Sequence, residues 1–426
     1  MNSNITTQEP LSVTQDRRLI RPRWHSKRFV VVRVTAPEAR QDRARPPVNL
    51  AFVLDRSGSM DGQKIRLAAQ AAQEGIGRLQ PDDRFSVVIY DDQVEILVAG
   101  TLASPDARRG AIDRLGQVRA RGTTDLSGGW LAGCEQVASS LTELGVNRVL
   151  LLSDGLANRG ITDRDVLFRH AAELRARGVS TSTFGVGDDF DEVLLGSMAQ
   201  SGGGHFYDIA TATAIRDHIS SEVGETLEIV ARDVVLEMTI PGDVRVESLA
   251  AFPVRDAGGR AVIALGDLVS GQEVEVPLRV FFSFGQVGTT MPAVFSLADR
   301  EGVFDGAGAR LAWEYADDRA NDAPPRQREV DRTVARVFAA RARQVAVELN
   351  GRGDYRGARK ALEATATKIR AYAGHDSELL AVVDELLRSA EDFERVMTKR
   401  ARKEAYAQSH YAMQSRLVDG TARRSV

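Results

Sequence analysis

The chain has 426 residues with 43% hydrophobic and 27% charged content, the composition of an ordinary globular protein of roughly two to three domains. The formal net charge of −3 leaves no global positive field to recruit nucleic acid. One cysteine excludes an internal disulfide, and no apolar stretch approaches the length of a membrane span. Because the polar start also lacks a secretory leader, we expect a soluble, cytoplasmic protein with reduced thiols.

Two short segments precede the main domain. Residues 1–15 are polar, which predicts a mobile N-terminus. Residues 16–45 contain the apolar run 29–34, which predicts an isolated strand followed by a short linker. A single strand needs partners for its backbone groups, so we expect it to pair with strands that come later in the chain.

Residues 46–226 alternate strand-like and helix-like patterns, which predicts a doubly wound, mostly parallel sheet covered on both faces. The first strand is the apolar run 48–54, and a tight turn at 91–92 joins two strands into an antiparallel edge. Strands are expected at 48–54, 85–90, 94–98, 147–153, 180–186 and 205–209. Helices are expected at 64–79, 105–115, 126–144, 163–177, 189–200 and 211–226.

The remaining chain changes character twice. Residues 227–316 show strand patterns separated by glycine and proline turns, which predicts an antiparallel β-sandwich. We expect the N-terminal strand to join it, so that the α/β domain is inserted into a sandwich made from both flanks. Residues 317–328 are polar and predict a linker. Residues 329–426 predict a helical region with a long helix from 378 to 411, whose mixed charged face could bind a second partner.

Oxygen-bearing side chains follow the strands of the α/β domain at the points where they end. Asp55, Ser57 and Ser59 come directly after the first strand, and Asp154 follows a later one. Thr124 stands at the start of a predicted helix. The carboxyl ends of strands in an open α/β sheet meet at one edge, where ligands bind, so we expect these residues to converge. Carboxylates and hydroxyls are hard ligands that suit Mg²⁺.

This pattern resembles the metal-ion-dependent adhesion site of von Willebrand factor type A (VWA) domains, in the form found in bacterial intracellular proteins, and the resemblance extends over residues 46–225. The resemblance implies a metal ligand set of Asp55, Ser57, Ser59, Thr124 and Asp154. It implies one Mg²⁺, although Mn²⁺ or Ca²⁺ would also suit these oxygens, and an Asp or Glu of a partner protein that completes the coordination. The expected partner-binding rim is Arg56, Met60, Asp91 and Gly155.

Two function classes follow. The favoured class is a non-enzymatic, metal-dependent protein–protein interaction module, an adaptor or scaffold. The alternative is a Mg²⁺-dependent phosphatase or hydrolase with Asp55 as its nucleophile. Such enzymes carry a second Asp two residues on as the general acid, and Ser57 stands at that position. A scaffold that has lost metal binding is disfavoured because the ligand set is complete. Plain helix capping by Asp55 and Ser57 would explain one loop but not all three.

Three other sequence features do not indicate a further functional site. A phosphate loop is disfavoured because the glycine spacing is wrong and no Ser or Thr follows Lys64. His170 and His205 have no ligand spacing, so we expect structural roles for both. The tripeptide 352–354 reads Arg-Gly-Asp, and we interpret it as a turn between helices.

Overall fold

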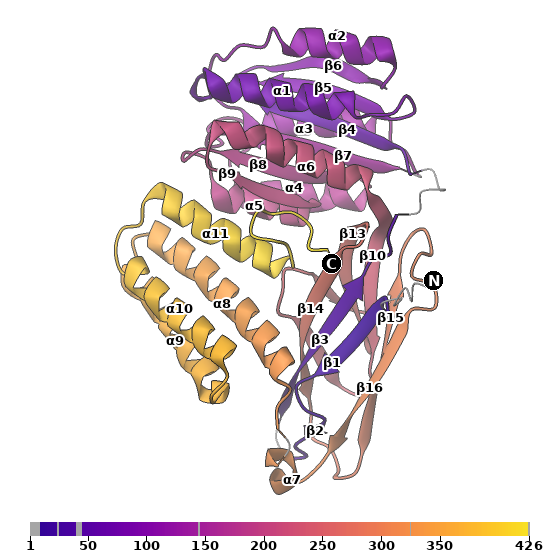
Figure 1. The fold of residues 1–426 in the computed structure, drawn as a ribbon, viewed down its shortest axis with the longest axis vertical. Coiled ribbons are helices and arrows are strands. Elements are labelled where there is room, and N and C mark those ends of the chain that lie inside the picture. Colours follow the sequence, from indigo (N-terminus) through magenta and orange to yellow (C-terminus); the bar gives the residue numbers. More distant parts are fainter. Residues whose placement is uncertain (1–8, 24, 40–44, 144, 324, 425–426) are drawn as a thin grey trace, which may run out of the picture.

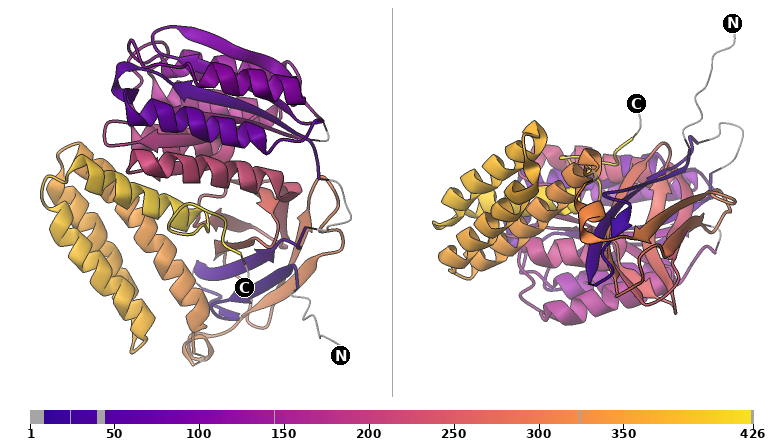
Figure 2. Two further views of the ribbon diagram at one scale, coloured as in Figure 1. Left: turned by 45° about the horizontal axis from the view of Figure 1, so that its top comes forward. Right: turned by 90° about the horizontal axis from the view of Figure 1, so that it is seen from below.

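The structure is a computed structural model that describes residues 9–23, 25–39, 45–143, 145–323 and 325–424. It comprises an α/β domain, a β-sandwich below it and a helical unit that lies beside both (Figures 1 and 2). The fold class expected from the sequence is therefore confirmed. None of the helices in the described ranges combines the length and the apolarity that crossing a bilayer requires.

The sheet of the α/β domain has six strands in the order β6-β5-β4-β7-β8-β9. All neighbouring pairs are parallel except β5 and β6, which form the expected antiparallel edge. Every residue of β4 is buried, as a central strand covered on both faces requires. The strands are β4 (Val48–Asp55), β5 (Arg84–Tyr90), β6 (Val94–Leu102), β7 (Val146–Ser153), β8 (Ser180–Val186) and β9 (Gly203–Ile209).

Two layers of helices cover this sheet because alternate residues of each strand point to opposite faces. Phe52 of β4 belongs to the core beneath α1, α2 and α6, and its neighbour Val53 belongs to the core beneath α3, α4 and α5. The helix expected to reach residue 144 ends at Ala138. The helices are α1 (Gln63–Gly77), α2 (Pro105–Leu115), α3 (Leu126–Ala138), α4 (Arg164–Ala176), α5 (Glu192–Ser201) and α6 (Ile215–Leu227).

The β-sandwich consists of two sheets, with strand orders β1-β3-β14-β11 and β12-β13-β10-β15-β16-β2. The N-terminal strand β3 pairs with β14 over its whole length, which is the pairing that the isolated strand was expected to find. The chain enters the α/β domain from β3 and leaves it into β10. The strands are β1 (Leu11–Gln15), β2 (Leu19–Ile20), β3 (Ser26–Thr35), β10 (Ile229–Thr239), β11 (Val244–Ser248), β12 (Val254–Asp256), β13 (Arg260–Val269), β14 (Glu273–Phe282), β15 (Thr290–Ala298) and β16 (Gly308–Tyr315).

Two expectations about the connecting segments are wrong. The N-terminus expected to be mobile contains β1, whose Leu11 is buried in the sandwich core, while residues 1–8 lie outside the described residues. The expected linker contains α7 (Asp318–Asp322), which begins after Asp317 because the Asp317 carboxylate accepts a hydrogen bond from the Ala320 N–H. Pairing with β3 orders Leu11–Gln15, and the Asp317 cap begins α7 within a polar stretch.

The helical unit comprises α8 (Arg328–Gly351), α9 (Tyr355–Ala373), α10 (Ser377–Phe393) and α11 (Lys399–Met413). The long helix expected from 378 to 411 is therefore two helices, the second of which begins with Thr398 as its cap. The turn at 352–354 separates α8 from α9, and the Asp354 carboxylate accepts a hydrogen bond from the Gly357 N–H. After α11 the chain returns to the sandwich, where the Glu273 N–H donates to the Arg423 carbonyl.

Candidate metal site and the network behind it

The two carboxylates expected to hold a metal lie at neighbouring strand ends. Asp55 is the last residue of β4, and Asp154 directly follows β7, which pairs with β4 in parallel. Asp55 Oδ1 accepts a 2.8 Å hydrogen bond from the Ser57 N–H, and Asp55 Oδ2 accepts one of 2.8 Å from Ser153 Oγ. These bonds fix the Asp55 carboxylate at the sheet edge. Both carboxylates are buried.

Hydroxyl groups from the first motif complete a compact cluster. Ser59 Oγ donates a 2.6 Å hydrogen bond to Asp154 Oδ1 and lies 3.1 Å from Ser57 Oγ. The loop that carries Thr124 is tied to the first loop by the Gly58 N–H, which donates to the Gly122 carbonyl at 3.1 Å. Ser59 is exposed, so the cluster opens to solvent on that side.

Thr124 reaches the loop that follows β7. A Cβ placed on Gly155 would lie 3.2 Å from Thr124 Oγ1, so the hydroxyl stands against the residue after Asp154. Thr124 is buried and Thr123 is exposed. The structure therefore brings together all the residues that the sequence predicted as metal ligands.

The chemistry of this cluster fits a hard divalent cation. Every candidate ligand atom is an oxygen, and two of the groups are buried carboxylates. Burial, together with the negative charge of Asp154, raises the pKa of Asp55 to about 6, although hydrogen bonds from Ser57 and Ser153 oppose that rise. Two buried carboxylates this close together favour a bound cation.

The expected partner-binding rim is wrong for three of its four residues. Arg56 is buried, and its Nε donates to Asp91 Oδ2 at 3.0 Å. Asp91 is fully buried beneath Arg56 and Arg121, and Met60 has no exposed surface. Only Gly155 keeps partial exposure. Arg56 pairs with the buried Asp91 carboxylate and also with the half-exposed Glu95. These buried residues therefore support the loops and offer little or no surface to a partner.

Sequence reasoning missed two polar residues at this site. Ser153 stands directly before Asp154 and donates to Asp55, but a hydroxyl at the end of an apolar strand gives little signal. Lys64 Nζ lies 2.5 Å from Asp154 Oδ2. Its position five residues after Ser59 at the start of α1 was considered only for a phosphate loop. Leu156, two residues after Asp154, is half exposed.

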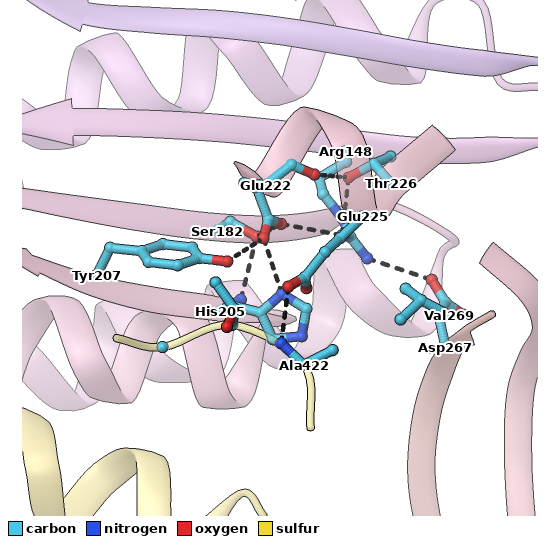
Figure 3. Close-up of polar contacts among 12 residues, drawn as sticks. Arg148, Ser182, His205, Tyr207, Glu222, Glu225, Thr226, Asp267, Val269 and Ala422 are labelled. Carbon is cyan, nitrogen blue, oxygen red and sulfur yellow. Dashed lines mark hydrogen bonds and ion pairs between the residues drawn. The ribbon is translucent and has the colours of Figure 1, made fainter. Parts of the chain in front are cut away.

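A second polar cluster lies between α6 and strands β7 to β9, around Glu222 of α6 (Figure 3). Glu222 accepts hydrogen bonds from Arg148 Nη1 at 3.0 Å and from Tyr207 OH at 2.8 Å, and its Oε2 lies 2.9 Å from His205 Nδ1. Burial alone would raise the pKa of Glu222, but the positive charges around it hold the pKa well below its usual range. His205 thus has the structural role expected from the sequence.

The same cluster includes Glu225, one turn further along α6. Glu225 Oε2 accepts a 2.5 Å hydrogen bond from Arg416 Nη2, and Oε1 accepts one of 2.8 Å from the Ala422 N–H. The group formed by His205, Glu222 and Glu225 has the spacing of a metal site. However, arginines already neutralise both carboxylates, so the cluster is an internal ion-pair network and not a cation site.

The doubly wound sheet, with an oxygen-rich cluster at the carboxyl ends of its strands, defines a domain of the von Willebrand factor type A class. Residues 49–221 match the model of the family described as "von Willebrand factor type A domain". The chain therefore contains a VWA domain, with the sandwich and the helical unit lying outside the matched residues.

Two curated bacterial proteins are similar to part of this chain, and both are described as uncharacterized. The uncharacterized protein YfbK of Escherichia coli is 28% identical over 234 residues, which cover 54% of this chain and 40% of that protein. The uncharacterized protein sll0103 of Synechocystis is 34% identical over 181 residues, 42% of this chain and 41% of that protein. The chain thus spans less than half the length of these curated relatives.

A solved structure resembles the whole chain in fold. The protein titled "von Willebrand factor type A from Catenulispora acidiphila" superimposes with a TM-score of 0.70 and 16% sequence identity. The match covers 100% of this chain and 99% of that one. At this identity the likeness concerns the fold alone, and it includes the combination of α/β domain, sandwich and helical unit.

Proposed function

We propose that this chain is a protein–protein interaction module whose VWA domain binds one divalent cation, Mg²⁺ in the first place and Mn²⁺ or Ca²⁺ as substitutes. The residues that would hold the ion are Asp55, Ser57, Ser59, Thr124 and Asp154. The bound ion would supply a Lewis-acidic position that an Asp or Glu of the partner protein occupies. The protein would then act as an adaptor or scaffold in the cytoplasm.

One observation carries this proposal. The hydrogen bond from Ser59 Oγ to Asp154 Oδ1 joins the first and third loops, while Ser59 itself stays exposed. A buried pair of carboxylates with an exposed hydroxyl beside it can hold a cation and still leave an open side for an outside ligand.

The enzymatic alternative has less support from the same residues. Asp55 has both carboxylate oxygens engaged, by the Ser57 N–H and by Ser153 Oγ, and it is fully buried. A nucleophilic carboxylate must reach its substrate, and a general acid must stand close to the leaving group. Ser57 occupies the position where such an acid would be expected. The site is therefore better suited to bind a cation than to use Asp55 as a nucleophile.

Two measurements, made one after the other, test the proposal. Titration calorimetry with Mg²⁺ and Mn²⁺ is expected to show one site in the full chain and no binding in Asp55→Asn. The exposed Asp113, on α2, provides the control Asp113→Asn, which removes the same charge from the same domain and keeps the site. Absence of binding in the wild type would contradict the metal site.

The partner is then identified by affinity capture from native lysate with Mg²⁺, with EDTA, and with Asp55→Asn. A partner retained only by the wild type and Asp113→Asn in the presence of Mg²⁺ supports recognition through the metal. Replacement of acidic residues in that partner should locate a single Asp or Glu whose loss abolishes capture. A partner held equally under all conditions would move the binding surface to the sandwich or the helical unit.

A further inference from the structure

Lys64 places a positive charge inside the candidate metal site. Its Nζ donates a 2.5 Å hydrogen bond to Asp154 Oδ2 and one of 3.2 Å to the Ser59 carbonyl. The lysine side chain is 31% exposed, whereas the Asp154 side chain has no exposed surface. The ammonium therefore enters the cluster from its solvent side, and it holds the Asp154 oxygen that Ser59 Oγ leaves free.

The charges around the site make this contact more than an ordinary surface ion pair. Within the described part of the chain, Lys64 is the only cation in ion-pair range of Asp154, and Asp55 has none. Two buried carboxylates in one cluster repel each other, and a buried charge without a partner is costly. The Lys64 ammonium is thus the counter-charge that stabilises this cluster from within the chain itself.

We propose that Lys64 acts as an internal cation that competes with the divalent ion for Asp154 and so sets the affinity of the site. This inference rests on the metal site proposed above. Lys64 would stabilise the metal-free cluster and, by the same charge, lower the affinity of the site for Mg²⁺. Lys64 is then a residue that sets the affinity of the site and is not a ligand of the metal.

The loop that follows β8 lies beside the Lys64 ammonium. A Cβ placed on Gly187, which follows β8, would lie 3.6 Å from Lys64 Nζ, and the chain continues there into Asp188 and Asp189. Both aspartates are exposed, and they already pair with Arg400 and Lys399 of α11. Lys64 is the second residue of α1, and its flexible, partly exposed side chain can leave Asp154 for solvent without moving the helix.

Titration calorimetry with Mg²⁺ and with Mn²⁺ at constant ionic strength tests the inference on the full chain. Lys64→Met keeps the length of the side chain and removes its charge, and we expect the Kd for Mg²⁺ to fall roughly tenfold. Lys64→Arg keeps the charge and is expected to stay within about twofold of the wild type. Lys360→Met is the control, because Lys360 is an exposed lysine of α9 on the helical unit.

A thermal melt of the metal-free proteins gives a second, independent readout. Without metal, Lys64→Met should melt at a lower temperature than the wild type. Saturating Mg²⁺ should raise its melting temperature by more than it raises that of the wild type. Lys64→Gln is measured alongside, so that a packing defect specific to methionine does not decide the result. Both variants are compared with Lys360→Met.

The outcomes separate the inference from the function on which it rests. Equal Kd values for the wild type, Lys64→Met and Lys64→Gln would overturn the role of Lys64 and leave the metal site standing. Weaker binding by the Lys64 variants would also overturn it, because Lys64 would then assist binding. Absence of binding in every protein would overturn the metal site as well. Tighter binding by Lys64→Met and Lys64→Gln than by the wild type supports the inference.

Discussion

Arg416 donates a 2.5 Å hydrogen bond from Nη2 to Glu225 Oε2, although 191 positions separate the two residues in sequence. Both side chains are buried. Glu225 lies on α6, the last helix of the VWA domain, and Arg416 belongs to the segment after α11. This ion pair therefore joins the C-terminal segment of the chain directly to the VWA domain, and Figure 3 shows Glu225 beside the Glu222 cluster.

Arg416→Ala should destabilise the protein by about 3–5 kcal/mol, because it leaves the Glu225 carboxylate buried without its cation. Denaturant unfolding monitored by circular dichroism gives the free energy of unfolding. Arg424→Ala is the matched control, since Arg424 pairs with Glu228 at 2.5 Å with both side chains partly exposed. Loss of that pair should cost about 0–1 kcal/mol. Equal effects of the two substitutions would contradict a special role for Arg416.

His410 should make the protein less stable as the pH falls below neutrality. Burial lowers the pKa of His410 to about 3, and the positive charges of His205 and Arg416 lower it as well. In the unfolded chain a histidine titrates near 6.5, so between these values the unfolded state binds more protons than the folded state. The free energy of unfolding must therefore decrease as the pH falls from about 6.5 toward 3.

The measurement is the free energy of unfolding at pH 7 and pH 5. His410 should account for about 2 kcal/mol of the loss between these values, and His410→Phe should remove that part. Phenylalanine preserves an aromatic ring against Phe206, whose ring centroid lies 5.6 Å from that of His410. His375→Gln, at an exposed position before α10, is the control, and its free energy of unfolding should change with pH as that of the wild type does. The same loss in His410→Phe would refute the assignment.

Gly133→Ala should destabilise the α/β domain by about 1–3 kcal/mol through overpacking. Gly133 lies in α3, and a Cβ at this position would stand 2.3 Å from Val53 Cγ2 of β4. The absence of a side chain lets α3 approach the strand that ends in Asp55. Gly110→Ala is the control, because Gly110 lies in α2 with open space around it. That change should be stabilising by about 0.5–1 kcal/mol in the same unfolding assay.

Asp154→Asn should abolish the response of the melting temperature to Mg²⁺. In the wild type, Mg²⁺ at about 100 times its Kd should add about 2.7 kcal/mol to the free energy of unfolding, and EDTA should remove this gain. The substitution keeps the shape of the side chain and removes the charge that Ser59 and Lys64 contact. Asp113→Asn should respond like the wild type. A rise of the same size in Asp154→Asn would exclude Asp154 from the site.

The candidate site was predictable from the sequence because its geometry follows from local rules. Asp55 and Asp154 each stand at the end of an apolar strand, and parallel strands bring such ends to one edge. The pairing of β3 with later strands was also predictable, since a lone strand must find partners for its backbone groups. These inferences needed only periodicity, motif order and hydrogen-bonding requirements.

The environment of the same residues was not predictable from the sequence. Arg56 and Asp91 are polar residues next to the motif, and nothing local distinguishes an exposed rim from a buried ion pair. The ordering of Leu11–Gln15 depends on β3. Likewise, the placement of Lys64 against Asp154 depends on how α1 packs over two neighbouring strands.

The sequence by itself therefore determined the class of fold and the oxygen-bearing loops, because both depend on patterns repeated within one strand or one helix. Only the tertiary structure decided which charges are paired and buried, and that the segment after α11 returns to α6. Such pairs join residues that are far apart in the chain. Their geometry is fixed by the packing of several elements at once, so no local pattern records it.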